Sequence, residues 1–120
     1  PIAMKSVIQS FTSVASNGRK IVVLGDIREL GEQSKALHAS ISEVIFPEEI
    51  QEVYLYGEEM SALFEVLKTR FEASHLHYVE SDKAVLIQLL KEELQQNDQV
   101  LVKSSNGTGL LAVVEALKEA

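Results

Sequence analysis

Apolar residues recur along the chain in two alternating patterns, one with the period of a helix and one continuous and β-branched. From Met4 to Phe11 they follow the i, i+3, i+4, i+7 spacing of a helix with one apolar stripe, which we predict over residues 2–16. Asn17-Gly18 is expected to end that helix. The run from Ile21 to Leu24 is then uninterrupted, as in a strand buried on both faces of a parallel sheet.

The same alternation continues to the end of the chain. The remaining predicted elements are helix 37–45, strand 53–56, helix 60–67, strand 76–79, helix 86–94, strand 100–102 and helix 110–117. A helix followed by four strand-helix units predicts an α/β fold, an open, mostly parallel sheet with helices on both faces in a Rossmann-like three-layer arrangement. We expect residues 1–120 to form one domain, because 120 residues with 46% hydrophobic content support one core and are too few for two.

Two loops at predicted strand ends carry candidate chemistry, since ligands of open parallel sheets bind beyond the carboxyl ends of the strands. The first loop follows the first strand and runs from Gly25 to Glu32. Two of its three acidic residues lie between its two glycines, and the third follows the second glycine. This stretch can present carboxylates to a cation, with Asp26 nearest the strand end. Equally, Gly25 and Gly31 can serve turns while the acids are solvated or favour the next helix.

The loop after the last predicted strand runs from Lys103 to Gly109 and leads directly into an apolar stretch. Its lysine, its serines and the free N–H groups of a helix start would suit an anion. The order of residues matches neither a phosphate-binding Walker loop nor a dinucleotide fingerprint. Capping of the helix by Ser105 or Thr108 explains the same residues equally well.

The three histidines give no metal site. His38 lies on the packing face of its predicted helix, which favours a hydrogen-bonded packing position beside the acidic loop over a catalytic base. His75 and His77 are spaced to share one side of a strand, but no third ligand is evident, and an exposed edge strand is the preferred interpretation.

The composition limits the classes of partner that the chain is expected to bind. The net charge is -7 without a basic run, which argues against nucleic acid and anionic membranes. No apolar run is long enough to span a bilayer, and the N-terminus lacks the layout of a signal peptide. With no cysteine, the chain fits a reducing cytoplasm.

The stretch Val23 to Glu32, followed by Leu37-His38, resembles a signature of the Mur ligases, ATP-dependent amide ligases of bacterial cell-wall synthesis, in the branch that adds D-alanyl-D-alanine. Weaker similarities lie, in the family's order, at Pro1 to Met4, Val53 to Gly57 and Val102 to Ser105. In the last of these, Ser104 stands where the family has glycine. Together the similarities span nearly the whole chain.

The resemblance implies the third, C-terminal domain of a three-domain enzyme. The full enzyme would use ATP and Mg²⁺, bound mainly by the central domain, to join D-alanyl-D-alanine to UDP-N-acetylmuramoyl-tripeptide. This domain would bind the dipeptide and close the active site against the central and N-terminal domains, and it would hold no cofactor, metal or catalytic residue. A segment before Pro1, with most of a further strand, is expected to belong to the domain.

The resemblance also divides the binding residues by charge. Asp26 and Glu29 are assigned to the amine side of the dipeptide. The residues assigned to its carboxylate are Lys103, Ser104, Ser105 and Asn106. Gly25, Gly31 and His38 would support the first loop.

Two alternatives come from other classes of protein. Asp26, Ser81-Asp82 and Lys103 resemble the layout of a phospho-acceptor signalling receiver, although such a site needs clustered acids to bind Mg²⁺. A free-standing small-molecule binding module is the third hypothesis.

Overall fold

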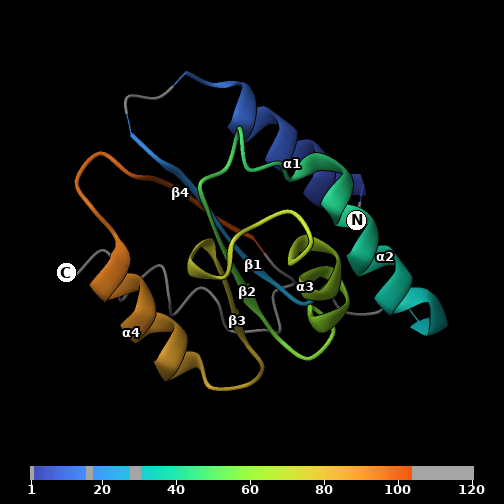
Figure 1. Ribbon diagram of the computed structural model, residues 1–120. Helices are drawn as coiled ribbons and strands as arrows, with labels where there is room; N and C mark the ends of the chain where they lie inside the picture. Colours follow the sequence, from blue (N-terminus) through green and yellow to red (C-terminus); the bar gives the residue numbers. More distant parts are fainter. Residues whose placement is uncertain (1, 16–17, 28–30, 104–120) are drawn as a thin grey trace.

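The structure is a computed structural model that describes the chain except residues 1, 16–17, 28–30 and 104–120 (Figure 1). The α-helices are α1 (Ile2–Ser13), α2 (Ser34–Ser40), α3 (Ser61–Leu67) and α4 (Lys83–Glu93). The strands are β1 (Lys20–Gly25), β2 (Glu52–Tyr56), β3 (Leu76–Val79) and β4 (Gln99–Lys103). Short 3-10 helices are η1 (Gly31–Gln33), η2 (Ile41–Val44) and η3 (Ala73–His75).

The four strands form one parallel sheet in the order β3-β2-β1-β4. Central strand β1 pairs with β2 on one side and with β4 on the other, in registers that place Leu24 opposite both Leu55 and Lys103. The buried runs of β1 and β2 follow from this position, because a strand with neighbours on both edges and helices on both faces has no side facing water.

Alternate strand residues feed two apolar cores. Val22 and Leu24 of β1 face a larger core built with α1, η2 and α3, whereas Ile21 and Val23 face a smaller one built with α4. Figure 1 shows the corresponding layers, with α1, α2 and α3 on one side of the sheet and α4 on the other.

The predicted fold class is confirmed, as are the four strands and their order along the chain. The first helix ends at Ser13, before the predicted residue 16. The predicted helix 37–45 divides into α2 and the tighter helix η2, which ends just before Ile45 adopts extended backbone. The predicted helix 110–117 lies outside the described residues.

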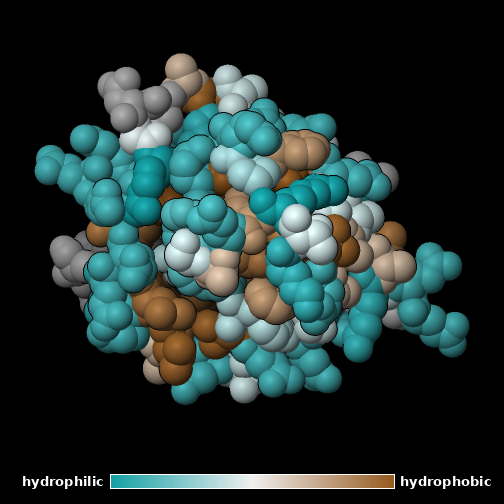
Figure 2. All heavy atoms as spheres, viewed as in Figure 1, coloured by the Kyte–Doolittle hydropathy of each residue, from teal (hydrophilic) through white to brown (hydrophobic). Residues whose placement is uncertain are grey.

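The visible face of the molecule is mostly hydrophilic, with hydrophobic side chains gathered over α4, where Val85 is 45% exposed (Figure 2). Among the described residues, no helix is both long enough and apolar enough to cross a membrane.

Candidate functional site

The two candidate loops start side by side at the carboxyl edge of the sheet. Leu24 pairs with Lys103 in the parallel register, so β1, which ends at Gly25, and β4, which ends at Lys103, finish side by side at the same edge. The chain order also reverses here, because β2 lies on one side of β1 and β4 on the other. Such a reversal is where open α/β sheets form a ligand crevice.

Asp26 links the first loop to the loop after β2. The backbone N–H of Glu59 donates to Oδ2 of Asp26 (3.2 Å), and that of Met60 donates to Oδ1 (3.0 Å). The N–H of Asp26 itself donates to the carbonyl of Tyr56 at 3.2 Å. Helix α3 begins directly after Met60, which provides no side-chain cap. The carboxylate of Asp26 therefore satisfies N–H groups that the start of α3 would otherwise leave open.

Gly57 makes room for this carboxylate. Its φ is +117°, a conformation that side chains disfavour, and a Cβ added there would lie 2.4 Å from Cγ and Oδ1 of Asp26. The N–H of Gly57 donates to the carbonyl of Val79, and its own carbonyl accepts from the Tyr78 hydroxyl (both 3.0 Å). Burial, followed by the nearby Glu80 and Asp26 carboxylates, raises the pKa of Tyr78, which favours the protonated hydroxyl as a donor.

His38 holds the same loop one residue further on. The N–H of Ile27 donates to Nε2 of His38 at 3.0 Å, so Nδ1 carries the proton and donates to the carbonyl of Ser34 at 2.7 Å. The imidazole is fully buried. It is engaged at both nitrogens by backbone groups, an arrangement that supports the loop and leaves no ring nitrogen for a proton transfer.

The other predicted site residues fall into two groups. Gly25 is the buried last residue of β1, Gly31 is the first residue of η1, and Lys103 ends β4 with an exposed side chain. Four predicted binding residues lie outside the described residues: Glu29, Ser104, Ser105 and Asn106.

Away from this edge, Glu52 is a buried carboxylate that the sequence analysis missed. It lies at the start of β2 and is only 3% exposed. Nε2 of His77 is 3.1 Å from its Oε1, and Nδ1 of His75 contacts Oε2. The ring of His77 also stacks on Tyr54, with 4.3 Å between centroids. β3 is an edge strand of the described sheet, as expected, and His77 on it and His75 just before it both contact Glu52, although the His75 side chain stays 49% exposed.

Asp82, one of the residues that suggested a receiver domain, has a structural role. Its carboxylate accepts from the N–H groups of Ala84 and Val85 and caps α4. Among the described residues, no group of three or more His, Asp or Glu side chains has the geometry to hold a metal ion.

Residues 1–106 match the family model described as "Mur ligase, glutamate ligase domain". The chain belongs to the Mur ligase family. Its Mur ligase relatives include two enzymes named UDP-N-acetylmuramoyl-tripeptide--D-alanyl-D-alanine ligase. The one from Bacillus subtilis is 36% identical over 120 residues, which are 99% of this chain and 26% of the relative. The one from Escherichia coli is 33% identical over 104 residues, which are 85% of this chain and 22% of the relative.

Solved Mur ligase structures share the fold. MurF from Acinetobacter baumannii superposes with a TM-score of 0.76 at 24% identity, covering all of this chain and 26% of that one. MurF from Thermotoga maritima, solved in complex with ADP, gives 0.74 at 23% identity, covering all of this chain and 27% of the other. This Mur ligase domain thus spans about a quarter of the length of these relatives.

Proposed function

We propose that this domain belongs to an ATP-dependent ligase that adds D-alanyl-D-alanine to UDP-N-acetylmuramoyl-tripeptide, and that it binds the incoming dipeptide. The observation that carries the proposal is the 36% identity over 120 residues with a ligase of that name. The side-by-side start of the two candidate loops supports it, because a dipeptide zwitterion needs an acceptor near its amine and donors near its carboxylate.

In the proposed reaction the tripeptide carboxylate is activated as an acyl phosphate, which the amine of the dipeptide attacks with release of phosphate. This domain contributes binding and orientation, and its closure onto the rest of the enzyme excludes water from the acyl phosphate. We assign ATP and Mg²⁺ to the central domain and no catalytic residue to this one. ATP and a UDP-linked substrate place the reaction in the cytoplasm.

Within the proposed dipeptide site, we assign the acidic loop with Asp26 and Glu29 to the amine side of the dipeptide. The second loop, which begins at Lys103, faces its carboxylate. The exposed ammonium of Lys103 lies one strand away from the acidic loop, so the two charges can address opposite ends of one small molecule. Ser104, Ser105 and Asn106 add donors on the carboxylate side.

Lys103→Met in the full-length enzyme tests this assignment. A charge-assisted hydrogen bond contributes about 1.5–3 kcal/mol, so the KM for D-alanyl-D-alanine should rise by about tenfold or more. The KM for ATP should change by less than about twofold, because uniform loss of dipeptide binding leaves the nucleotide site intact. Steady-state phosphate release, with each substrate varied in turn, measures both constants.

The matched control is Lys91→Met. It also removes one positive charge from an exposed lysine, but this lysine lies on α4, away from the two loops. It should leave both constants unchanged. An unaltered dipeptide KM in Lys103→Met would remove Lys103 from the pocket. Absence of any phosphate release that depends on D-alanyl-D-alanine in the wild-type enzyme would refute the proposed function itself.

A further inference from the structure

We propose that Asp26 is a positioning residue of the dipeptide site, acting through the loop that it fixes rather than by contact with the dipeptide's amine. This inference rests on the proposed function and assigns Asp26 a specific part in it. Both of its carboxylate oxygens already accept a backbone N–H, from Glu59 and Met60. Those two contacts face α3 and join the β1 and β2 loops, whose side-by-side strands end at this edge.

The contact is built into the backbone on both sides. Gly57 adopts a positive φ, and any side chain there would collide with the Asp26 carboxylate at 2.4 Å. On the far side of the loop, His38 accepts from the N–H of Ile27. Two successive backbone N–H groups are therefore held by hydrogen bonds, that of Asp26 to the carbonyl of Tyr56 and that of Ile27 to His38.

Negative charge at Asp26 also has a local purpose. Met60 supplies no side-chain cap to α3, so the carboxylate provides the acceptor at that helix start from a different strand. If α3 moves, the acidic loop moves with it. Asp26 thereby fixes the start of the loop after β1 against the loop after β2.

Two ligands distinguish positioning from direct contact. D-alanyl-D-alanine and N-propionyl-D-alanine differ only in the amine, which the second compound lacks. Their dissociation constants are measured by calorimetry on the full-length enzyme with UDP-N-acetylmuramoyl-tripeptide and a non-hydrolysable ATP analogue present. Asp26→Ala and Gly57→Ala should each weaken both ligands by a similar factor of about five or more, the scale expected when a binding loop loses its support.

Gly57→Ala is the decisive variant because it keeps the carboxylate and its charge while displacing it. Asp26→Asn retains one acceptor oxygen and is used if Asp26→Ala does not fold, as judged by circular dichroism. Asp82→Ala is the matched control. Asp82 also accepts from two N–H groups at the start of a helix, in its case α4, but it belongs to the loop after the edge strand β3. Its loss should leave both dissociation constants unchanged.

Amide hydrogen exchange on the same full-length variants measures the link without any ligand. The amides of Glu59 and Met60 should lose protection in Asp26→Ala and in Gly57→Ala, and keep it in Asp82→Ala. A loss of affinity confined to the amine-bearing dipeptide would overturn the proposal in favour of direct contact, and so would unchanged protection at residues 59 and 60. If the wild-type enzyme binds neither ligand while protection is lost as expected, the proposed function fails and the link stands.

Discussion

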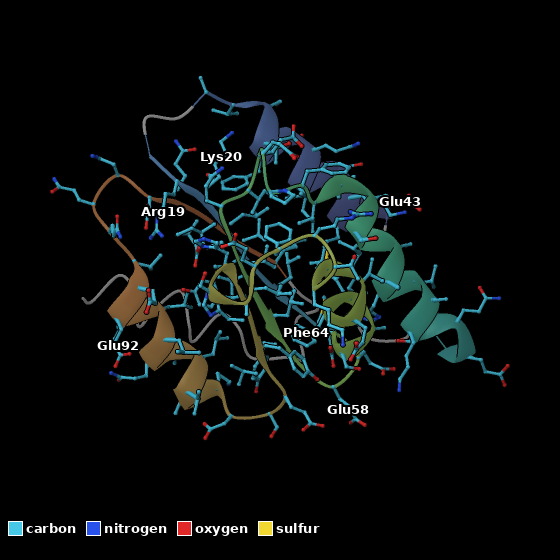
Figure 3. All side chains as sticks on the ribbon, viewed as in Figure 1. Arg19, Lys20, Glu43, Glu58, Phe64 and Glu92 are labelled. Atoms are coloured by element: carbon cyan, nitrogen blue, oxygen red, sulfur yellow. The ribbon has the colours of Figure 1, made fainter. Side chains whose placement is uncertain are left out.

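Removing the carboxylate of Asp98 should destabilise the fold more than removing any exposed acid. Asp98 lies just before β4, and its side chain is 4% exposed. Arg19, just before β1, donates to it twice, from Nε at 3.1 Å and from Nη2 at 2.8 Å. The N–H of Gln95 donates a third hydrogen bond at 2.7 Å. In Figure 3, Arg19 and Lys20 lie at the end of the sheet opposite Glu58. The Arg19–Asp98 ion pair therefore joins the starts of β1 and β4 far from the candidate site.

The expected cost follows from these contacts. Hydrogen bonds to charged groups contribute about 1.5–3 kcal/mol each in favourable cases, but the Arg19 side chain is 28% exposed and can regain water. We therefore expect Asp98→Ala to lower the free energy of unfolding by about 2–3 kcal/mol, well below the sum of three such bonds. Asp98→Asn, which retains an acceptor for Gln95, should cost about 1–2 kcal/mol.

The pH dependence follows from the bond to Arg19, the main cause that lowers the pKa of Asp98 below its ordinary value of 3.8. A carboxyl whose pKa is lower in the folded state stabilises the fold above its unfolded pKa and loses that contribution as pH falls through the folded pKa. The difference between wild type and Asp98→Asn should therefore be constant from pH 7 to about pH 5 and shrink below about pH 4.

Urea unfolding of the 120-residue chain, followed by circular dichroism from pH 3 to pH 7, measures these values. Glu65→Ala is the control, because Glu65 forms an exposed ion pair with Lys68 and should change stability by less than about 0.5 kcal/mol. A loss in Asp98→Ala no larger than that of the control, or a difference that grows as pH falls below 4, would refute the reasoning.

Three further substitutions test other contacts by the same urea assay. Tyr54→Phe should leave stability unchanged or raise it by up to about 1 kcal/mol, because the buried hydroxyl has no hydrogen-bond partner among the described residues; a clear loss would reveal one. Lys20→Met should cost about 1–2 kcal/mol, since Nζ of the buried Lys20 donates to the carbonyls of Phe11 and Val14 at the end of α1; unchanged amide exchange in α1 would contradict this. Gly18→Ala should cost about 2 kcal/mol or more, because its Cβ would lie 2.1 Å from a backbone carbonyl oxygen; wild-type stability would show that the loop yields.

The sequence predicted the sheet well because burial leaves a direct trace in composition. Central strand β1 is apolar at every position from Ile21 to Leu24, and such a run has few alternatives to a strand covered on both faces. The helix predicted over 86–94 from its apolar stripe is present as α4, but it begins earlier, at Lys83, because Asp82 caps it. The order of strands in the sheet was not predicted, because pairing between β1 and β4 leaves no local pattern in either strand.

The site was predicted less completely, because its contacts, like strand pairing, leave no local pattern in the sequence. Asp26 was found because it follows a strand end, but its partners are backbone N–H groups, which carry no residue-specific signal. Glu52 was missed because it precedes an apolar run as any solvated acid would, and only the parallel pairing of β2 with β3 brings His77 beside it. Contacts made by backbone, or across strands, are fixed by tertiary structure and cannot be read from spacing along the chain.

The central place of β1 also decides when the sheet can be completed during synthesis. One neighbour, β2, is the next strand along the chain, but the other, β4, is the last of the described strands, and the Arg19–Asp98 pair that joins the starts of β1 and β4 links residues 79 apart. Until β4 leaves the ribosome, the apolar edge of β1 from Ile21 to Leu24 has no partner and is open to pairing with another chain. Nascent chains halted before Gln99 should therefore be strong chaperone substrates, and release should coincide with the emergence of β4.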